Sequence, residues 1–160
     1  MTSLPSSGIA SGPNIPGRGE QDPGIEERPG QQLERVQIIK GWLQDGQPQF
    51  RVHDVASASG ALVEPTVADS CDTRREGATR LCAHWQDPDL DPTVQAFYYV
   101  RVLERPSCRW HARVCDAAGV DCNAPESVSE GFEACCDPGY PRWQRERAWS
   151  SPIWVEPSDS

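Results

Sequence analysis

The chain has 160 residues, a formal net charge of −9 and seven cysteines. Its length suits one domain, and its acidic charge disfavours the basic surface that nucleic acid or an anionic membrane requires. No apolar stretch approaches the length of a membrane span, so neither nucleic acid nor a membrane is an expected partner.

Residues 1–30 are dense in glycine, proline and serine. The sizeable apolar side chains here are Leu4, Ile9, Ile15 and Ile25, too few to offset the entropy lost when the segment is ordered. We therefore predict a disordered or extended segment over residues 1–30. A β domain is expected over residues 31–157, with a tail over residues 158–160.

Residues 96–104 form the clearest strand, because aromatic and β-branched side chains alternate there with a period of two. Phe97 and Tyr99 would point to one face, and Tyr98 and Val100 to the other. Both faces need cover, which predicts a central strand.

Further strands are predicted between clusters of glycine, proline and aspartate. They cover residues 33–43, 50–56, 79–85 and 153–155. Asp45 and Gly46 are expected to turn the first two into a hairpin, with a loop longer than two residues. The fold class is therefore mostly β: a small antiparallel β-sandwich-like domain with a disordered N-terminus. A long cysteine-rich irregular loop over residues 108–140 would carry short helical turns near residues 126–134.

The cysteines exceed what a reduced cytosolic domain of this size usually carries, which indicates an oxidising compartment. They are Cys71, Cys82, Cys108, Cys115, Cys122, Cys135 and Cys136. We predict a Cys71–Cys82 disulfide, because these residues bracket a polar loop, and further bridges within the later loop. The adjacent Cys135 and Cys136 should pair with different partners, and one thiol should stay free. Residues 1–30 hold no signal peptide, so a fragment with its export signal upstream is the simplest interpretation.

Two metal sites can be drawn from the sequence, each with a simpler alternative. Cys108, His111, Cys115 and Cys122 offer zinc ligands, but their spacing is unlike the common paired patterns, and disulfides explain the same cysteines. The run of Asp87, Asp89 and Asp91 offers calcium oxygens, but prolines interrupt it and favour a turn stabilised by Asp side chains. We favour the disulfides and the turn, and expect no cofactor in this chain.

Catalytic residues are not indicated. His53, His84 and Glu64 would form an acid–base set only if the fold happened to bring them together, and no nucleophile elbow, phosphate loop or dinucleotide fingerprint occurs.

Late tryptophans and arginines alternate in a way that suits either core packing or the stacking of a ligand. They are Trp110, Trp143, Trp149 and Trp154, with Arg109, Arg142, Arg145 and Arg147. Core packing is the commoner use of such residues.

Several motifs in order resemble the domain of unknown function 3604 family over residues 21–157. They lie at residues 35–42, 85–92, 96–104, 108–110 and 146–154. The residues that carry the resemblance include Lys40, Gly41, Trp42, Asp87, Asp89, Asp91, Tyr98, Tyr99, Arg101, Arg109, Trp110, Glu146, Arg147, Ser151, Pro152 and Trp154.

The resemblance implies a longer bacterial, exported protein whose upstream part is a metal-binding barrel like that of polymerase and histidinol phosphatase type hydrolases. The family's metal ligands would lie on that barrel and have no matching positions here. Residues 11–20 are rich in glycine and proline where the family leads one to expect a strand, which favours a truncated chain.

This chain is thus expected to be a non-catalytic C-terminal β domain that packs on the barrel, periplasmic or extracellular, with self-association through the face left uncovered. The alternative is a free-standing, disulfide-linked ligand-binding or interaction module that uses the Arg/Trp-rich C-terminal region.

Overall fold

The computed structural model describes residues 13–26, 28–59, 71 and 77–157. Glu64 and the tail over residues 158–160 lie outside this part. The elements within it are β1 (Asn14–Glu20), β2 (Gly24–Ile25), β3 (Arg28–Pro29), β4 (Leu33–Gln44), β5 (Gln47–Ser57), β6 (Arg80–Gln86), β7 (Ala96–Glu104), β8 (Ser107–Cys108), α1 (Trp110–Ala117), η1 (Pro125–Ser127), η2 (Glu133–Cys136), β9 (Trp143–Gln144), β10 (Arg147–Trp149) and β11 (Ile153–Val155). The mostly-β fold class is confirmed.

The main sheet is antiparallel and places β7 between β4 and the two short strands β10 and β11, with β5 on the far side of β4. Strand β7 has the predicted bounds. The hairpin of β4 and β5 turns through two residues, Asp45 and Gly46, which have φ angles of 53° and 74°. Positive φ at both positions is typical of the tight turn that matches strand twist, so the longer loop predicted from the sequence is wrong.

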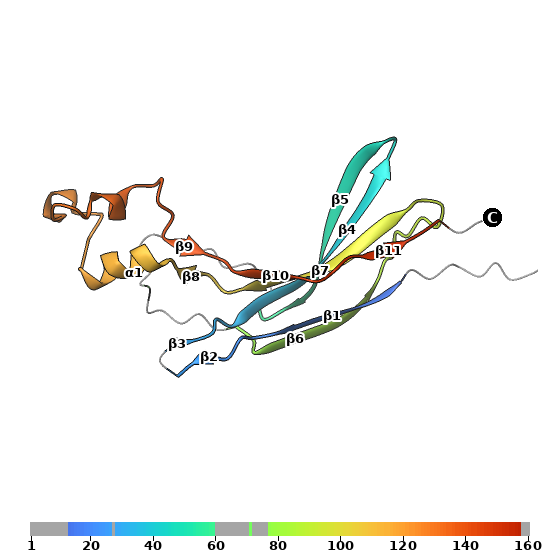
Figure 1. The fold of residues 1–160 in the computed structure, drawn as a ribbon, viewed down its shortest axis with the longest axis horizontal. Helices are drawn as coiled ribbons and strands as arrows, with labels where there is room; N and C mark the ends of the chain where they lie inside the picture. The colour runs from blue at the N-terminus through green and yellow to red at the C-terminus, as the bar shows by residue number, and fades with distance from the viewer. Residues whose placement is uncertain (1–12, 27, 60–70, 72–76, 158–160) are drawn as a thin grey trace, which may run out of the picture.

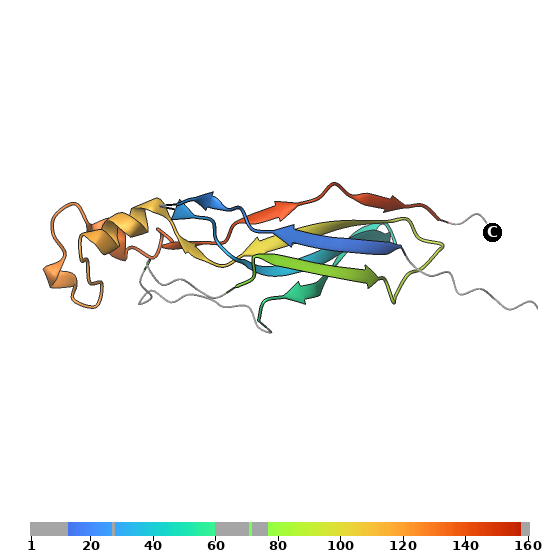
Figure 2. The same ribbon diagram turned by 90° about the horizontal axis from the view of Figure 1, so that it is seen from below.

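A second sheet, formed by β1 and β6, covers the inner face of the main sheet (Figures 1 and 2). The buried core between the sheets contains Ile15, Ile38, Ala96 and Tyr98. Its partly buried border includes Trp42, Val55, Trp85, Val100 and Val155.

Strand β1 shows that part of the segment predicted to be disordered or extended is an ordered strand, and residues 1–12 lie outside the described residues. It also supplies the strand that residues 11–20 were expected to lack, so their composition does not favour truncation. The glycines of β1 hide it from a prediction based on apolar alternation. A Cβ on Gly19 would lie 2.8 Å from Cγ1 of Val102, and a Cβ on Gly17 would lie 3.1 Å from Cγ1 of Val36. Glycine thus lets β1 approach the main sheet closely, while Ile15 supplies the apolar contact.

A cysteine-rich arm formed by residues 107–144 extends from one end of the sheets (Figure 1). It contains η1 and η2, near the predicted helical turns, and also helix α1, which the sequence did not predict. Disulfides join Cys115 to Cys135 and Cys122 to Cys136 within the arm.

The third disulfide joins Cys71 to Cys108, so the predicted Cys71–Cys82 pair is wrong. Cys82 is a free, exposed thiol on β6. The even-numbered residues of β6 face away from the core, whereas Cys71 is held beside the arm by a 2.8 Å hydrogen bond from its backbone N–H to Oδ2 of Asp116.

Candidate functional site

Strand β4 supplies side chains to two different surfaces, because successive residues point to opposite faces of the sheet. Lys40 and Trp42 lie on the inner face, in register with Tyr98 and Ala96 of β7. Gly41 lies on the outer face, in register with Phe97. The two surfaces are described in turn.

On the inner face, a buried ion pair joins Lys40 to Asp87. The hydroxyl of Tyr98 donates a 2.7 Å hydrogen bond to the same carboxylate oxygen of Asp87, and Lys40 Nζ also donates to the backbone carbonyl of Asp89 at 3.0 Å. The side chains of Asp87 and Lys40 are 0% and 9% exposed, so water stabilises neither charge and each is stabilised by its partner.

The pKa values reflect this arrangement. Burial disfavours the charged form of Asp87, but hydrogen bonds from Lys40, Tyr98 and the backbone of Asp89 outweigh it and hold the carboxyl pKa below its usual value. Burial, followed by the hydrogen bond to Asp87, raises the pKa of Tyr98 well above its usual value. Asp87 is therefore an anion and Tyr98 a neutral donor at neutral pH.

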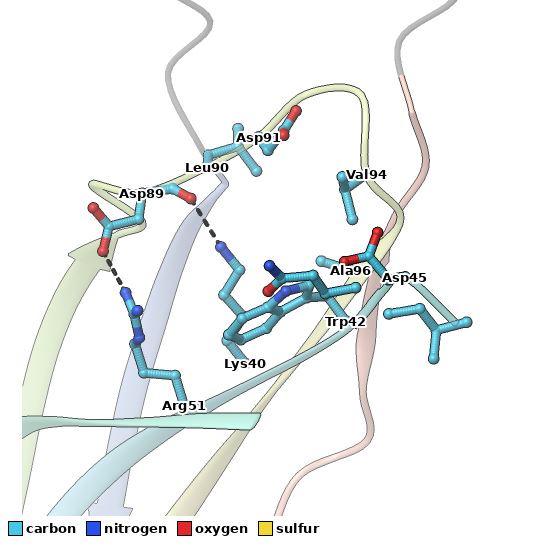
Figure 3. A pocket seen from close by; sticks show the side chains of 11 residues that line it. Lys40, Trp42, Asp45, Arg51, Asp89, Leu90, Asp91, Val94 and Ala96 are labelled. Atoms are coloured by element: carbon cyan, nitrogen blue, oxygen red, sulfur yellow. Dashed lines mark hydrogen bonds and ion pairs between the residues drawn. The ribbon is translucent and has the colours of Figure 1, made fainter. Parts of the chain in front are cut away.

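Beside this network lies a cleft of about 400 Å³ between the β4–β5 hairpin and the segment that joins β6 to β7. Figure 3 shows the Trp42 ring below Leu90 and Val94, with Lys40 and Arg51 to its left. Lys40 Nζ lies 5.3 Å and the Arg51 guanidinium carbon 5.9 Å from the centroid of the Trp42 ring. Gln44, Asp45, Asp89 and Asp91 complete the polar part of the lining.

On the opposite face of the sheet, large apolar side chains are exposed together. We call this surface the outer aromatic face. Its exposed side chains are Leu43, Phe50, Val52, Trp149 and Trp154, and the half-buried Phe97 and Tyr99 lie on the same face.

One row of the outer aromatic face runs across four strands. Phe50 of β5, Gly41 of β4, Phe97 of β7 and Trp154 of β11 are in register with one another. The Phe97 ring lies 6.2 Å from that of Phe50 and 5.2 Å from that of Trp154. A Cβ on Gly41 would lie 2.3 Å from Cζ of Phe97, so this glycine makes room for the ring that joins the row.

The structure divides the residues of the predicted family motifs among these surfaces. Lys40, Asp87 and Tyr98 form the buried network, while Trp42, Asp89 and Asp91 line the cleft. Gly41, Tyr99, Arg101 and Trp154 lie on the outer face of the sheet. Arg109 and Trp110 lie at the start of α1, and Glu146, Arg147, Ser151 and Pro152 lie in or beside the edge strands.

The alternative metal sets are not assembled within the part of the chain that the structure describes. Three of the zinc candidates, Cys108, Cys115 and Cys122, are in disulfides. Among the described residues, no group of three His, Cys, Asp or Glu side chains is arranged to hold a metal ion.

The Asp87–Asp91 segment is a turn in which carboxylates accept backbone N–H groups. Asp87 Oδ1 accepts from Asp89 at 2.9 Å, and Asp91 Oδ1 accepts from Thr93 at 2.9 Å. The predicted turn, stabilised by Asp side chains that accept backbone N–H groups, is therefore confirmed.

The two histidines of the predicted acid–base set, His53 and His84, lie in different surroundings. His53 packs against Trp85 with ring centroids 4.5 Å apart, and burial lowers its pKa. His84 follows the exposed, even-numbered side of β6, opposite to the side of Trp85.

Arginines of the late Arg/Trp-rich region are used inside the molecule. Arg142 forms an ion pair with Asp116, and Arg145 forms one with the buried Glu34 at 3.0 Å. Trp149 and Trp154 belong to the outer aromatic face, whereas Trp110 is exposed on the arm. The region is therefore not a single ligand site.

These features define a disulfide-linked antiparallel β domain with an exposed aromatic sheet face and a small polar cleft. The family model described as "Protein of unknown function (DUF3604)" matches residues 19–157, and the chain belongs to this family. No curated protein and no solved structure matches the chain. The three disulfides indicate an oxidising compartment, and no helix in the described residues is long and apolar enough to span a membrane.

Proposed function

We propose that this chain is a non-catalytic C-terminal β domain that packs through its outer aromatic face on the metal-binding barrel of an exported, metal-dependent hydrolase. The observation that carries the proposal is the outer aromatic face itself. The proposed partner, a barrel that carries the catalytic metal ligands, is taken from what the family resemblance implies. The disulfides fit a periplasmic or extracellular protein.

The exposed part of the outer aromatic face can supply the apolar centre of an interface. Phe50, Trp149 and Trp154 are 65%, 58% and 60% exposed. An aromatic side chain buries about 150–250 Å², so covering these three alone would remove roughly 350 Å² from water. At about 25 cal/mol per Å² this corresponds to about 9 kcal/mol before the costs of association. The largest apolar patch of a soluble protein commonly has about this size and is often functional.

The chemistry of the face favours a protein partner. Its aromatic row is bordered by a polar row in which Arg101 Nε donates to Gln37 Oε1 at 2.8 Å, and Gln37 donates to Asp54 at 2.7 Å. Such an apolar centre with a satisfied polar border is the usual anatomy of a protein–protein interface. The net charge of −9 disfavours nucleic acid and anionic lipid.

The proposal is tested by mixing the purified chain with the barrel domain of a longer family member and measuring complex formation by light scattering after gel filtration. A 1:1 complex is expected, and Phe50→Ser and Trp154→Ser should each weaken it. Trp110→Ser is the matched control, because Trp110 is 78% exposed but lies on the arm. The chain alone should show no metal-dependent hydrolysis of phosphoesters or carboxyl esters.

Three results would overturn the proposal. One is the lack of any complex, and another is a complex that Trp110→Ser weakens as much as Trp154→Ser does. The third is metal-dependent turnover by the chain alone. A stable homodimer that Phe50→Ser dissociates would assign the outer aromatic face to a second copy of this chain instead.

A further inference from the structure

We propose that the cleft beside Trp42 binds a neutral sugar ring, which stacks on the indole and donates hydroxyl hydrogen bonds to the surrounding carboxylates. This site lies on the inner face of the main sheet and does not depend on the outer aromatic face or on its partner. Three features of the cleft support this proposal: its size, the partners of its charged groups and the surroundings of the Trp42 ring.

The cleft has the dimensions and composition of a small-molecule site. Its volume of about 400 Å³ lies within the range of about 300–1,000 Å³ that ligand pockets occupy. Leu90, Val94 and Ala96 provide apolar wall, and Trp42 provides a flat aromatic surface (Figure 3). The cleft is open to solvent, which suits a ligand that keeps one edge hydrated.

The positive charges of the cleft are held by partners within the chain. Lys40 Nζ bonds to Asp87 and to the carbonyl of Asp89, and Arg51 Nη1 bonds to Asp89 Oδ2 at 2.5 Å. Asp45, Asp91 and the second oxygen of Asp89 remain as acceptors around the cleft, with the Gln44 amide beside them. The polar lining is therefore rich in acceptors, which match a ligand rich in hydroxyl donors.

The charge around the ring favours a neutral ligand. Two cations, Lys40 and Arg51, already lie within 6 Å of the Trp42 centroid, so a third cation on this ring would be repelled. An anion would face Asp45, Asp89 and Asp91. A pyranose carries no charge, and its apolar C–H face and polar hydroxyl edge match the indole and the carboxylates.

The cleft is also organised before a ligand arrives. Asp91 Oδ1 accepts hydrogen bonds from the Thr93 hydroxyl at 2.6 Å and from the Thr93 backbone N–H at 2.9 Å. These bonds lower the pKa of Asp91 and keep it charged. Trp42 packs against the core, so neither the stacking surface nor this acceptor must be ordered on binding.

The test is a titration of the ¹⁵N-labelled chain with methyl glycosides of glucose, galactose, mannose and xylose in the millimolar range, followed through the indole N–H signals. Because the chain has six tryptophans, the Trp42 signal is assigned as the one lost in Trp42→Phe. At least one glycoside should shift the Trp42 signal saturably and leave the Trp110 signal unchanged.

Two variants test the carboxylates without disturbing the fold. Asn is well suited to the tight turn at Asp45, and Asp91→Asn retains the oxygen that accepts from Thr93. Asp45→Asn and Asp91→Asn should each weaken binding about tenfold, as expected for the loss of a charged hydrogen-bond acceptor. Asp121→Asn is the matched control, because Asp121 accepts the backbone N–H of Asn123 at 2.9 Å in a similar turn on the arm.

The same titration with propylammonium and with acetate separates the alternatives. Saturable shifts of the Trp42 signal with either ion and not with glycosides would overturn the sugar assignment. The lack of a Trp42 shift with every glycoside would also overturn it, as would a loss of affinity in Asp121→Asn equal to that in Asp91→Asn.

Discussion

Neutralising the buried Lys40–Asp87 pair one partner at a time gives the sharpest prediction about stability. Asp87→Asn would leave the ammonium of Lys40 almost fully buried, with the Asp89 carbonyl at 3.0 Å as its remaining strong acceptor. Lys40→Met would leave a fully buried carboxylate that accepts from Tyr98 and the Asp89 backbone. Breaking a buried pair on one side costs about 3–5 kcal/mol, so each single variant should lose that much unfolding free energy.

The double variant should recover much of the loss, because Met and Asn leave no isolated buried charge. Replacing both members of a buried pair is often close to neutral, so the double variant should lose less unfolding free energy than either single variant. The coupling free energy between the two sites should therefore exceed about 3 kcal/mol. Urea unfolding followed by tryptophan fluorescence measures all four proteins of this cycle. Losses that add to within about 0.5 kcal/mol would refute the reasoning, since additivity is the behaviour of independent sites.

Three further predictions concern the same network, the disulfides and Gly41. The pKa of Asp87 is lower in the folded protein than in the unfolded chain. Its contribution to stability is therefore present above the unfolded-state pKa and is lost as the pH falls through the folded-state pKa. The loss of unfolding free energy below about pH 4 should accordingly be smaller in Asp87→Asn than in the unchanged protein. Alkylation of the native, non-reduced protein should modify Cys82, and alkylation of Cys71 in its place would contradict the pairing. The double variant Cys71→Ser and Cys108→Ser should lower the unfolding free energy by about 4 kcal/mol, because it opens a loop of 37 residues. Gly41→Ala should cost about 1–3 kcal/mol by displacing the Phe97 ring, and Phe97→Leu in the same chain should recover part of that loss in thermal unfolding.

Alternation of side chains was enough to predict the centre of the fold. The period of two over residues 96–104 matches β7 at both ends, and the neighbouring strands follow in the predicted order. Strand β1 could not be found in this way, because Gly17 and Gly19 occupy inward positions where an alternation argument requires apolar side chains. Their role depends on the distance between two sheets, which a single sequence does not state.

The disulfide pairing and the cleft also depend on the tertiary arrangement, so neither could be predicted from the local sequence. Cys82 is the nearer partner of Cys71 along the chain, but the register of β6 turns its side chain to solvent, while Cys71 itself lies beside Cys108 of β8. The cleft combines residues of the β4–β5 hairpin with residues of the segment before β7. Lys40 contacts the backbone carbonyl of Asp89 next to its buried ion pair with Asp87, and no local motif in the sequence predicts that pair.

Arginine has a structural use in this chain that its composition alone did not reveal. Lys40 is the single lysine among 15 basic residues, and a bias toward arginine suits either a binding surface or internal ties. Glu34, which is fully buried, forms ion pairs with both Arg105 and Arg145 at 3.0 Å, so one carboxylate joins β4, the end of β7 and the chain returning from the arm. Arg142 likewise ties that returning chain to Asp116 of α1. Because these guanidinium groups fix the path from the arm to β10 and β11, they also position Trp149 and Trp154, and the outer aromatic face depends on them although they are not part of it.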